Sequence, residues 1–125
     1  MASKTLLGSK KNDTFKVAKG SVLTVDGGAG SDLVNLVGSS KTLTTLSQKA
    51  LHLKNVETLR GTSSADLLTI QNFTGSQLTV DLLAGKNIIN ASPWKRASKQ
   101  SLTLLGGKDS DTFKVAKGTT LTIDG

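Results

Sequence analysis

Apolar and polar residues alternate in short runs along most of the chain, and bends rich in glycine separate the runs. In runs such as Leu23-Thr24-Val25 and Phe15-Lys16-Val17, every second side chain is apolar, which is the period of a β-strand with one buried face. Glycine is abundant, and the aromatic residues are only three Phe and one Trp. The pattern predicts an all-β protein whose core consists of thin layers of Leu, Val and Ile.

The alternating runs recur around one motif that begins with a threonine. Its six copies begin at Thr5, Thr24, Thr58, Thr79, Thr103 and Thr122. Eight residues later, each complete copy has an acidic or amide residue: Asp13, Asp32, Asp66, Asn87 and Asp111. An apolar residue follows two positions after each of these. Each copy therefore predicts a strand, a bend, a second strand and a return loop.

Successive acidic or amide positions lie 19, 34, 21 and 24 residues apart. The long interval contains two further apolar runs, at Leu43–Leu46 and 51–53, which we interpret as a degenerate turn. Turns of this kind bury their apolar faces only by stacking, and identity at fixed offsets argues against a β-sandwich. We predict a right-handed parallel β-solenoid of about six turns of roughly 19–24 residues, with the acidic and amide residues in a single column.

A longer repeat contains these turns. Residues 3–27 and 101–125 align without a gap, and 18 of the 25 positions are identical. The string Asp-Thr-Phe-Lys-Val-Ala-Lys-Gly occurs at 13–20 and again at 111–118. We therefore expect residues 1–125 to form a single solenoid domain, which comprises one 98-residue unit and the start of a second copy at 101–125.

The bends resemble the haemolysin-type calcium-binding (RTX-like) β-roll repeats of large secreted bacterial proteins, whose nonapeptide is Gly-Gly-x-Gly-x-Asp-x-apolar-x. The match is full at residues 27–35 and nearly full at 106–114. In that family, glycine carbonyls and Asp carboxylates of neighbouring bends share each Ca²⁺, which needs six or more oxygens. The resemblance makes Asp32, Asp109 and Asp111 candidate Ca²⁺ ligands.

The bends also depart from the family pattern. Lysines occupy them at Lys10, Lys11, Lys86 and Lys108, and no two strongly matching bends are neighbours. Family members usually have such a bend at both ends of each turn, whereas this sequence predicts it at one end only. We expect these lysines to neutralise the column of carboxylates in place of the cation. Ca²⁺ is then a candidate ligand and no cofactor is required.

Charge adds two alternatives for a binding surface. The net charge is +7, cysteine is absent, and no apolar stretch is long enough to span a bilayer. Lys16, Lys19, Lys114, Lys117 and the loop 93–99 could attract an acidic polysaccharide or an anionic cell surface, with Trp94 as a stacking platform. Alternatively, Trp94 packs over the edge of the solenoid and the charges are solvated. One Trp among scattered lysines is a weak pattern for nucleic acid, which we do not expect.

Catalytic chemistry is not expected of this sequence. Hydrolases and lyases need paired carboxylates, or a His or Cys partner, in one cleft. Here the carboxylates are needed at the bends, and His52, the one histidine, is expected on the surface without a partner. The threonines that begin each copy resemble the hydroxyl rows of ice-binding surfaces, but threonine is also a common outward-facing strand residue.

The sequence therefore favours a structural role. We expect a repeat of an extracellular or cell-surface adhesin, surface layer or matrix fibre. Because the first and last turns are near-copies, we expect head-to-tail stacking of solenoid ends into filaments, a contact that need not close. The alternative is a calcium-stabilised secretion module or an acidic-polysaccharide-binding β-roll.

Overall fold

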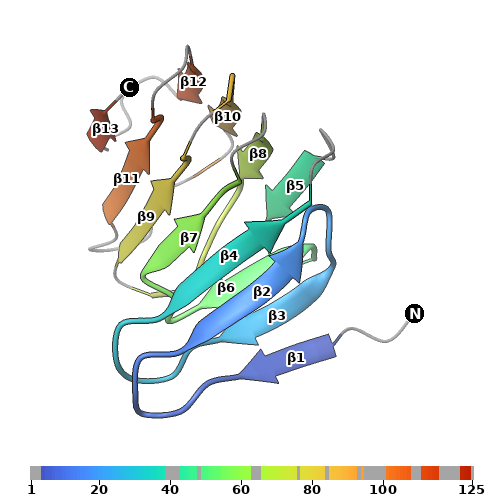
Figure 1. The fold of residues 1–125 in the computed structure, drawn as a ribbon, viewed down its shortest axis with the longest axis vertical. Coiled ribbons are helices and arrows are strands. Elements are labelled where there is room, and N and C mark those ends of the chain that lie inside the picture. Colours follow the sequence, from blue (N-terminus) through green and yellow to red (C-terminus); the bar gives the residue numbers. More distant parts are fainter. Residues whose placement is uncertain are drawn as a thin grey trace.

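A computed structural model describes residues 4–38, 43–47, 49–62, 66–75, 77–83, 85–92, 94, 101–107, 111–115 and 122–124. The strands in these residues are β1 (Lys4–Leu7), β2 (Thr14–Ala18), β3 (Leu23–Asp26), β4 (Leu33–Val37), β5 (Leu43–Leu46), β6 (Leu51–Lys54), β7 (Thr58–Arg60), β8 (Leu67–Ile70), β9 (Gln77–Asp81), β10 (Ile88–Ala91), β11 (Ser101–Leu105), β12 (Thr112–Val115) and β13 (Thr122–Asp124). Every pairing between them is parallel. The predicted parallel β-solenoid is confirmed (Figure 1).

The strands form two sheets that enclose the core. One sheet has the order β1-β3-β6-β5-β8-β10-β12, and the other has the order β13-β11-β9-β7-β4-β2. Along most strands buried and less buried residues alternate, as the sequence pattern predicts. The buried residues are mostly Leu, Val and Ile, contributed by both sheets. Stacked turns therefore bury what no single turn could bury alone.

The chain does not alternate strictly between the sheets, because β5 and β6 follow one another in the same sheet. These two strands lie nearly end to end and share only the Leu46–Leu51 pair. On one side of this row, β6 pairs with β3. On the other side, β5 pairs with β8, and Lys54 forms a bridge with Thr74. The seven-stranded sheet thus offers two strand positions in each turn, and the six-stranded sheet offers one.

Because β5 and β6 are consecutive strands of the same sheet, every later segment is shifted by one strand position. Before β5, each Asp-containing bend leads from the seven-stranded to the six-stranded sheet; after β7, each such bend leads back the other way. The prediction of about six equivalent turns is therefore wrong. In the described residues, the longest run of equivalent turns is about three, from β7 to β12. The 34-residue interval is long because it adds one strand position to a full turn.

The threonines are divided between the two sheets for the same reason. Thr5 pairs with Thr24 in the seven-stranded sheet. Thr58, Thr79, Thr103 and Thr122 form a continuous row in the six-stranded sheet. Such rows of neighbouring side chains stabilise a sheet through cross-strand contacts.

A buried hydroxyl connects the first turn to the row that contains β5. Thr44 is almost fully buried, and its Oγ1 accepts a hydrogen bond from the backbone N–H of Gly20 at 3.0 Å. Replacing Thr44 with Val keeps the shape but removes this acceptor. We expect T44V to lower the free energy of unfolding by about 1–2 kcal/mol, measured by urea denaturation. Thr45→Val, at the adjacent less buried position, should change it by less than about 0.5 kcal/mol; equal effects would contradict this role of Thr44.

Candidate functional site

The polar residues of the bends form two ladders rather than one column. The first ladder lies where β1 and β3 lead into β2 and β4, and consists of Asp13, Asp32 and Glu57. The backbone N–H of Asp13 donates to Asp32 Oδ1 at 2.9 Å, and that of Asp32 donates to Glu57 Oε1 at 2.7 Å. In each step, a side chain accepts the N–H of the turn before it. The ladder thus satisfies donors that a partly buried bend would otherwise leave unpaired.

The second ladder lies at the opposite edge, where β7, β9 and β11 lead into β8, β10 and β12. The backbone N–H of Asp66 donates to Asn87 Oδ1 at 2.8 Å, and that of Asn87 donates to Asp111 Oδ1 at 3.1 Å. The Asn87 amide also donates to Asp111 Oδ1 at 2.9 Å and to the carbonyls of Gly85 and Gly106. Asn87 therefore acts as donor and acceptor between two acidic turns.

The prediction of a single column is therefore wrong. Asp13 and Asp32 lie at one edge, whereas Asp66, Asn87 and Asp111 lie at the other. The switch of strand position at β5 and β6 is the cause. Glu57, which sequence reasoning missed, takes the place of the next aspartate in the first ladder. The sequence offered one signal for it, since Glu57 falls between the degenerate turn and the next Thr-headed motif.

A buried ion pair involves Asp66, the first residue of the second ladder. Lys19 Nζ lies 2.9 Å from Asp66 Oδ1, and the two side chains are only 3% and 2% exposed. Asp66 also accepts hydrogen bonds from the N–H and hydroxyl of Thr62. Lys19 follows β2 in the first turn, so this pair connects the N-terminal turns to the C-terminal ones. Lys19 was predicted to be a surface cation for an anionic ligand, and that prediction is wrong.

Three of the four lysines predicted to replace a metal form no ion pair with a bend carboxylate in the described residues. Lys10, Lys11 and Lys86 are exposed, and none of them forms an ion pair with the described residues. Lys108 lies outside the described residues. A lysine does neutralise a bend carboxylate, but it is Lys19, which comes from a return segment rather than from a bend.

The described residues do not by themselves fit a calcium site. Asp32 and Asp111 belong to different ladders, and Asp109 lies outside the described residues. Asp32 Oδ2 and Asp111 Oδ2 are buried without a hydrogen-bond partner. No group of three or more acidic or histidine side chains lies close enough, within the described part of the chain, to share an ion. Ca²⁺ prefers six or more oxygens. Calcium therefore stays a prediction that only a binding measurement tests.

The Asp32 carboxyl lies in an environment that disfavours its charged form. Burial raises the pKa of Asp32 above its ordinary value, although the hydrogen bond from the Asp13 backbone lowers it, and the nearby charges of Glu57 and Asp13 raise it further. Folding therefore favours the protonated form of this group more than the unfolded chain does. The carboxylates of this ladder thus serve the bend and repel one another.

Trp94 is part of the core rather than a binding platform. It is 1% exposed, and its ring stacks on Phe73 at 6.0 Å between centroids. A buried ring cannot stack on a sugar, so the prediction of Trp94 as a platform is wrong, and its alternative of packing is confirmed. Pro93 and residues 95–99 of the basic loop lie outside the described residues, as does Lys117. Lys16 and Lys114 are exposed.

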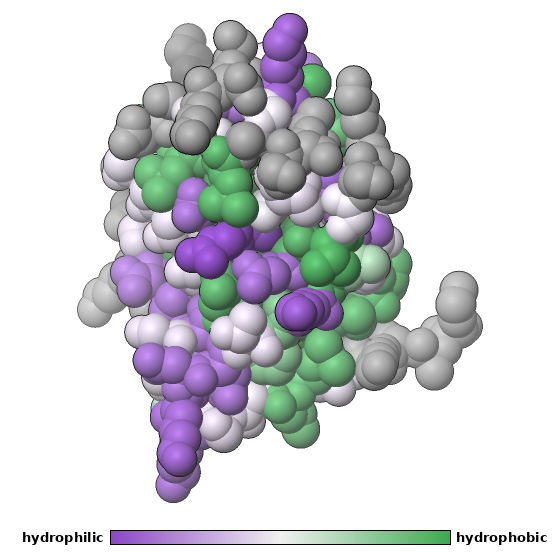
Figure 2. All heavy atoms as spheres, in the orientation of Figure 1, coloured by the Kyte–Doolittle hydropathy of each residue, from purple (hydrophilic) through white to green (hydrophobic). Residues whose placement is uncertain are grey.

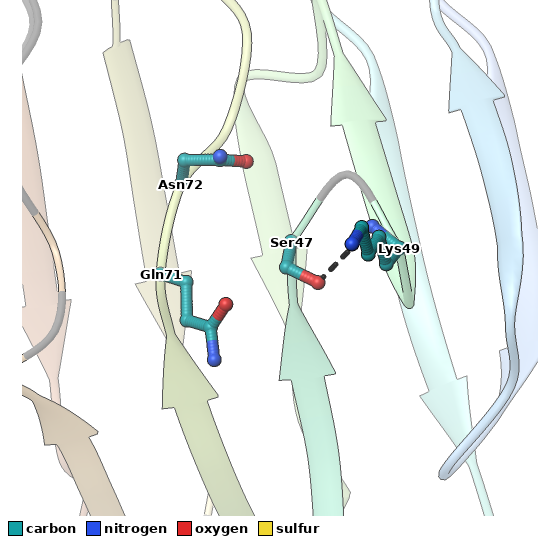
Figure 3. A pocket seen from close by; sticks show the side chains of 4 residues that line it. All are labelled: Ser47, Lys49, Gln71 and Asn72. Atoms are coloured by element: carbon teal, nitrogen blue, oxygen red, sulfur yellow. Dashed lines mark hydrogen bonds between the residues drawn. The ribbon is translucent and has the colours of Figure 1, made fainter.

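A shallow polar pocket of about 280 Å³ lies beside the end of β5 (Figure 3). Ser47, Lys49, Gln71 and Asn72 line it, and the Lys49 N–H donates to Ser47 Oγ. No acid–base pair is present among these four side chains. His52 lies elsewhere on the seven-stranded sheet, half-buried, with Nε2 3.0 Å from Thr74 Oγ1. Burial, then the charge of Lys54, lowers the His52 pKa.

Comparisons with protein families, with curated proteins and with solved structures give no match for this chain. None of the described segments is a helix that could cross a membrane.

The Lys19–Asp66 pair predicts a large cost for removing the cation alone. Lys19→Met keeps most of the side chain but leaves a buried carboxylate unpaired. We expect a loss of about 3–5 kcal/mol in the free energy of unfolding, measured by urea denaturation. Lys16→Met, which alters an exposed lysine three residues earlier, should change it by less than about 0.5 kcal/mol. The K19M/D66N double variant should recover part of the loss, and a mild K19M variant would contradict the importance of the pair.

Asn87 predicts a second, pH-dependent cost. In Asn87→Asp the amide donors are lost and a carboxylate faces Asp111 Oδ1, where the amide nitrogen is 2.9 Å away. We expect at least about 2 kcal/mol of destabilisation at neutral pH. Because the like charge raises the pKa of the new carboxyl, the loss should shrink as pH falls and the group protonates. Asn90→Asp, where the native side chain only accepts from Ser92, is the control and should be mild.

Proposed function

We propose that this chain is a structural repeat of an extracellular fibre, surface layer or adhesin, and that its solenoid ends stack head to tail. The observation that carries the proposal is the state of the two ends. One end presents the outermost strands β1 and β2, and the other presents β12 and β13 (Figure 1). The backbone groups on the outer side of such strands are available to pair with another strand.

Apolar side chains accompany these open strands. Val115 is 44% exposed, whereas Val17, its equivalent in the first copy, is 2% exposed. Ile123 is 41% exposed, whereas its equivalent Val25 is fully buried. Both face inward by the alternation of their strands, so a further turn stacked on this end would cover them. Figure 2 shows hydrophobic residues also gathered at the opposite end, around β1.

The sequence of the two ends supports the same partner for both. Residues 3–27 and 101–125 are near-copies, so the two ends carry nearly the same strands. In the first copy β1 pairs with β3, and in the second copy their counterparts β11 and β13 pair in the same way. All strands run parallel, and head-to-tail contact keeps that direction. Such a contact is heterologous and adds subunits without closing. A further turn reaches these strands in the same way whether it comes from another copy or from a longer tandem chain.

The exposed apolar end predicts how to block assembly. We expect filaments in negative-stain micrographs of the purified chain, both with Ca²⁺ and with excess chelator. Val115→Lys places a charge on the open end and should abolish them. Leu43→Lys, at a similarly exposed position (51%) on β5 in the middle of the seven-stranded sheet, should leave them unchanged.

Three results of this experiment contradict parts of the proposal. Dispersed particles under both conditions would overturn self-assembly. Filaments only with Ca²⁺ would favour the calcium-stabilised module instead. Equal assembly of the two lysine variants would mean that the ends are not the contact.

A further inference from the structure

We infer that each added copy in the stack is rotated by one strand position relative to the copy before it, so that the corner at Asp111 meets the corner at Asp13 of the next copy. This inference rests on the proposed head-to-tail stacking and specifies its register. It follows from where the repeated sequence lies in the fold.

The same sequence occupies different strand positions in the two copies. The string at 13–20 contains β2, which lies in the six-stranded sheet next to β4. The identical string at 111–118 contains β12, which lies in the seven-stranded sheet next to β10. Likewise β1 and β3 lie in the seven-stranded sheet, whereas their counterparts β11 and β13 lie in the six-stranded one. One 98-residue unit therefore advances the pattern by whole turns plus one strand position.

Rotation by one position allows strands to meet strands at the junction. In the rotated stack, β2 of the next copy lies on β12 and β1 of the next copy lies on β13. Without rotation, β2 would lie on β13, and β12 would face the segment after β2, which is not a strand. The rotated stack thus forms two strand pairings across the junction, whereas the unrotated stack forms only one.

The polar ladder is also continued only in the rotated stack. Within the chain, the N–H of each rung donates to the carboxylate or amide oxygen of the next turn. The N–H of Asp111 has no such acceptor among the residues that the structure describes. Rotation places the Asp13 carboxylate of the next copy at that level, followed by Asp32 and Glu57. Without rotation, the residue at this edge is Lys19, which is engaged with Asp66.

One interaction opposes the rotated stack. It places Lys114 opposite Lys16 of the next copy, whereas the unrotated stack places Asp124 opposite Lys16, according to the registers inside each sheet. Lys16 and Lys114 are both exposed, so solvent and salt weaken their repulsion. An N–H left without an acceptor inside the junction and an unpaired strand are not screened in this way. The rotated stack is therefore favoured.

The test uses pairs of singly substituted chains, and the absence of native cysteine makes the labelling specific. Chains with Lys16→Cys are mixed with chains carrying either Lys114→Cys or Asp124→Cys, assembled, and treated with a short bis-maleimide crosslinker. We expect the K16C–K114C heterodimer to exceed K16C–D124C by at least about tenfold, because only held neighbours have a high effective concentration.

The outcomes separate the two proposals. If K16C–D124C dominates in chains that form filaments, the rotation is wrong and the stacking stands. Similar low yields in both mixtures, with filaments present, would also overturn the rotation. If neither mixture crosslinks and no filaments form, both proposals fail together.

Discussion

The need of every buried backbone N–H for an acceptor governs this fold. At each bend the chain leaves a strand, so the sheet no longer supplies that acceptor. Asp32, Glu57, Asn87 and Asp111 supply it instead, and each side chain accepts from the turn before. The polar residues of the bends thus bind neighbouring turns together, in the same direction as the pairing of the strands.

Charge limits how far such a ladder extends. Successive carboxylates repel one another, and two features relieve the repulsion: Asn87 separates Asp66 from Asp111, and Lys19 neutralises Asp66. In the first ladder, burial first and the acidic neighbours as well raise the pKa of the Asp32 carboxyl. Within the described residues an amide and a lysine thus reduce the repulsion, and the lysine is not one of the bend lysines.

The sequence predicted the strands and the core well, but not the path between the sheets. Alternation at residues such as Val25 and Leu104 determines which face is buried, and this follows from local geometry. The switch at β5 and β6 depends instead on which rows meet across long separations, such as Leu46 with Ile70 and Leu51 with Leu23. No local pattern encodes that choice. The same gap explains why Lys19 was assigned to the surface, since its partner Asp66 lies 47 residues away in the sequence.

The central claim is that side chains of the next turn hold the bend amides, and amide hydrogen exchange measured by NMR tests it most directly. The account predicts that the N–H groups of Asp13, Asp32, Asp66 and Asn87 exchange as slowly as those in the neighbouring strands. Exchange of these four amides at the rate of exposed loops, while the strand amides stay protected, would contradict the ladders.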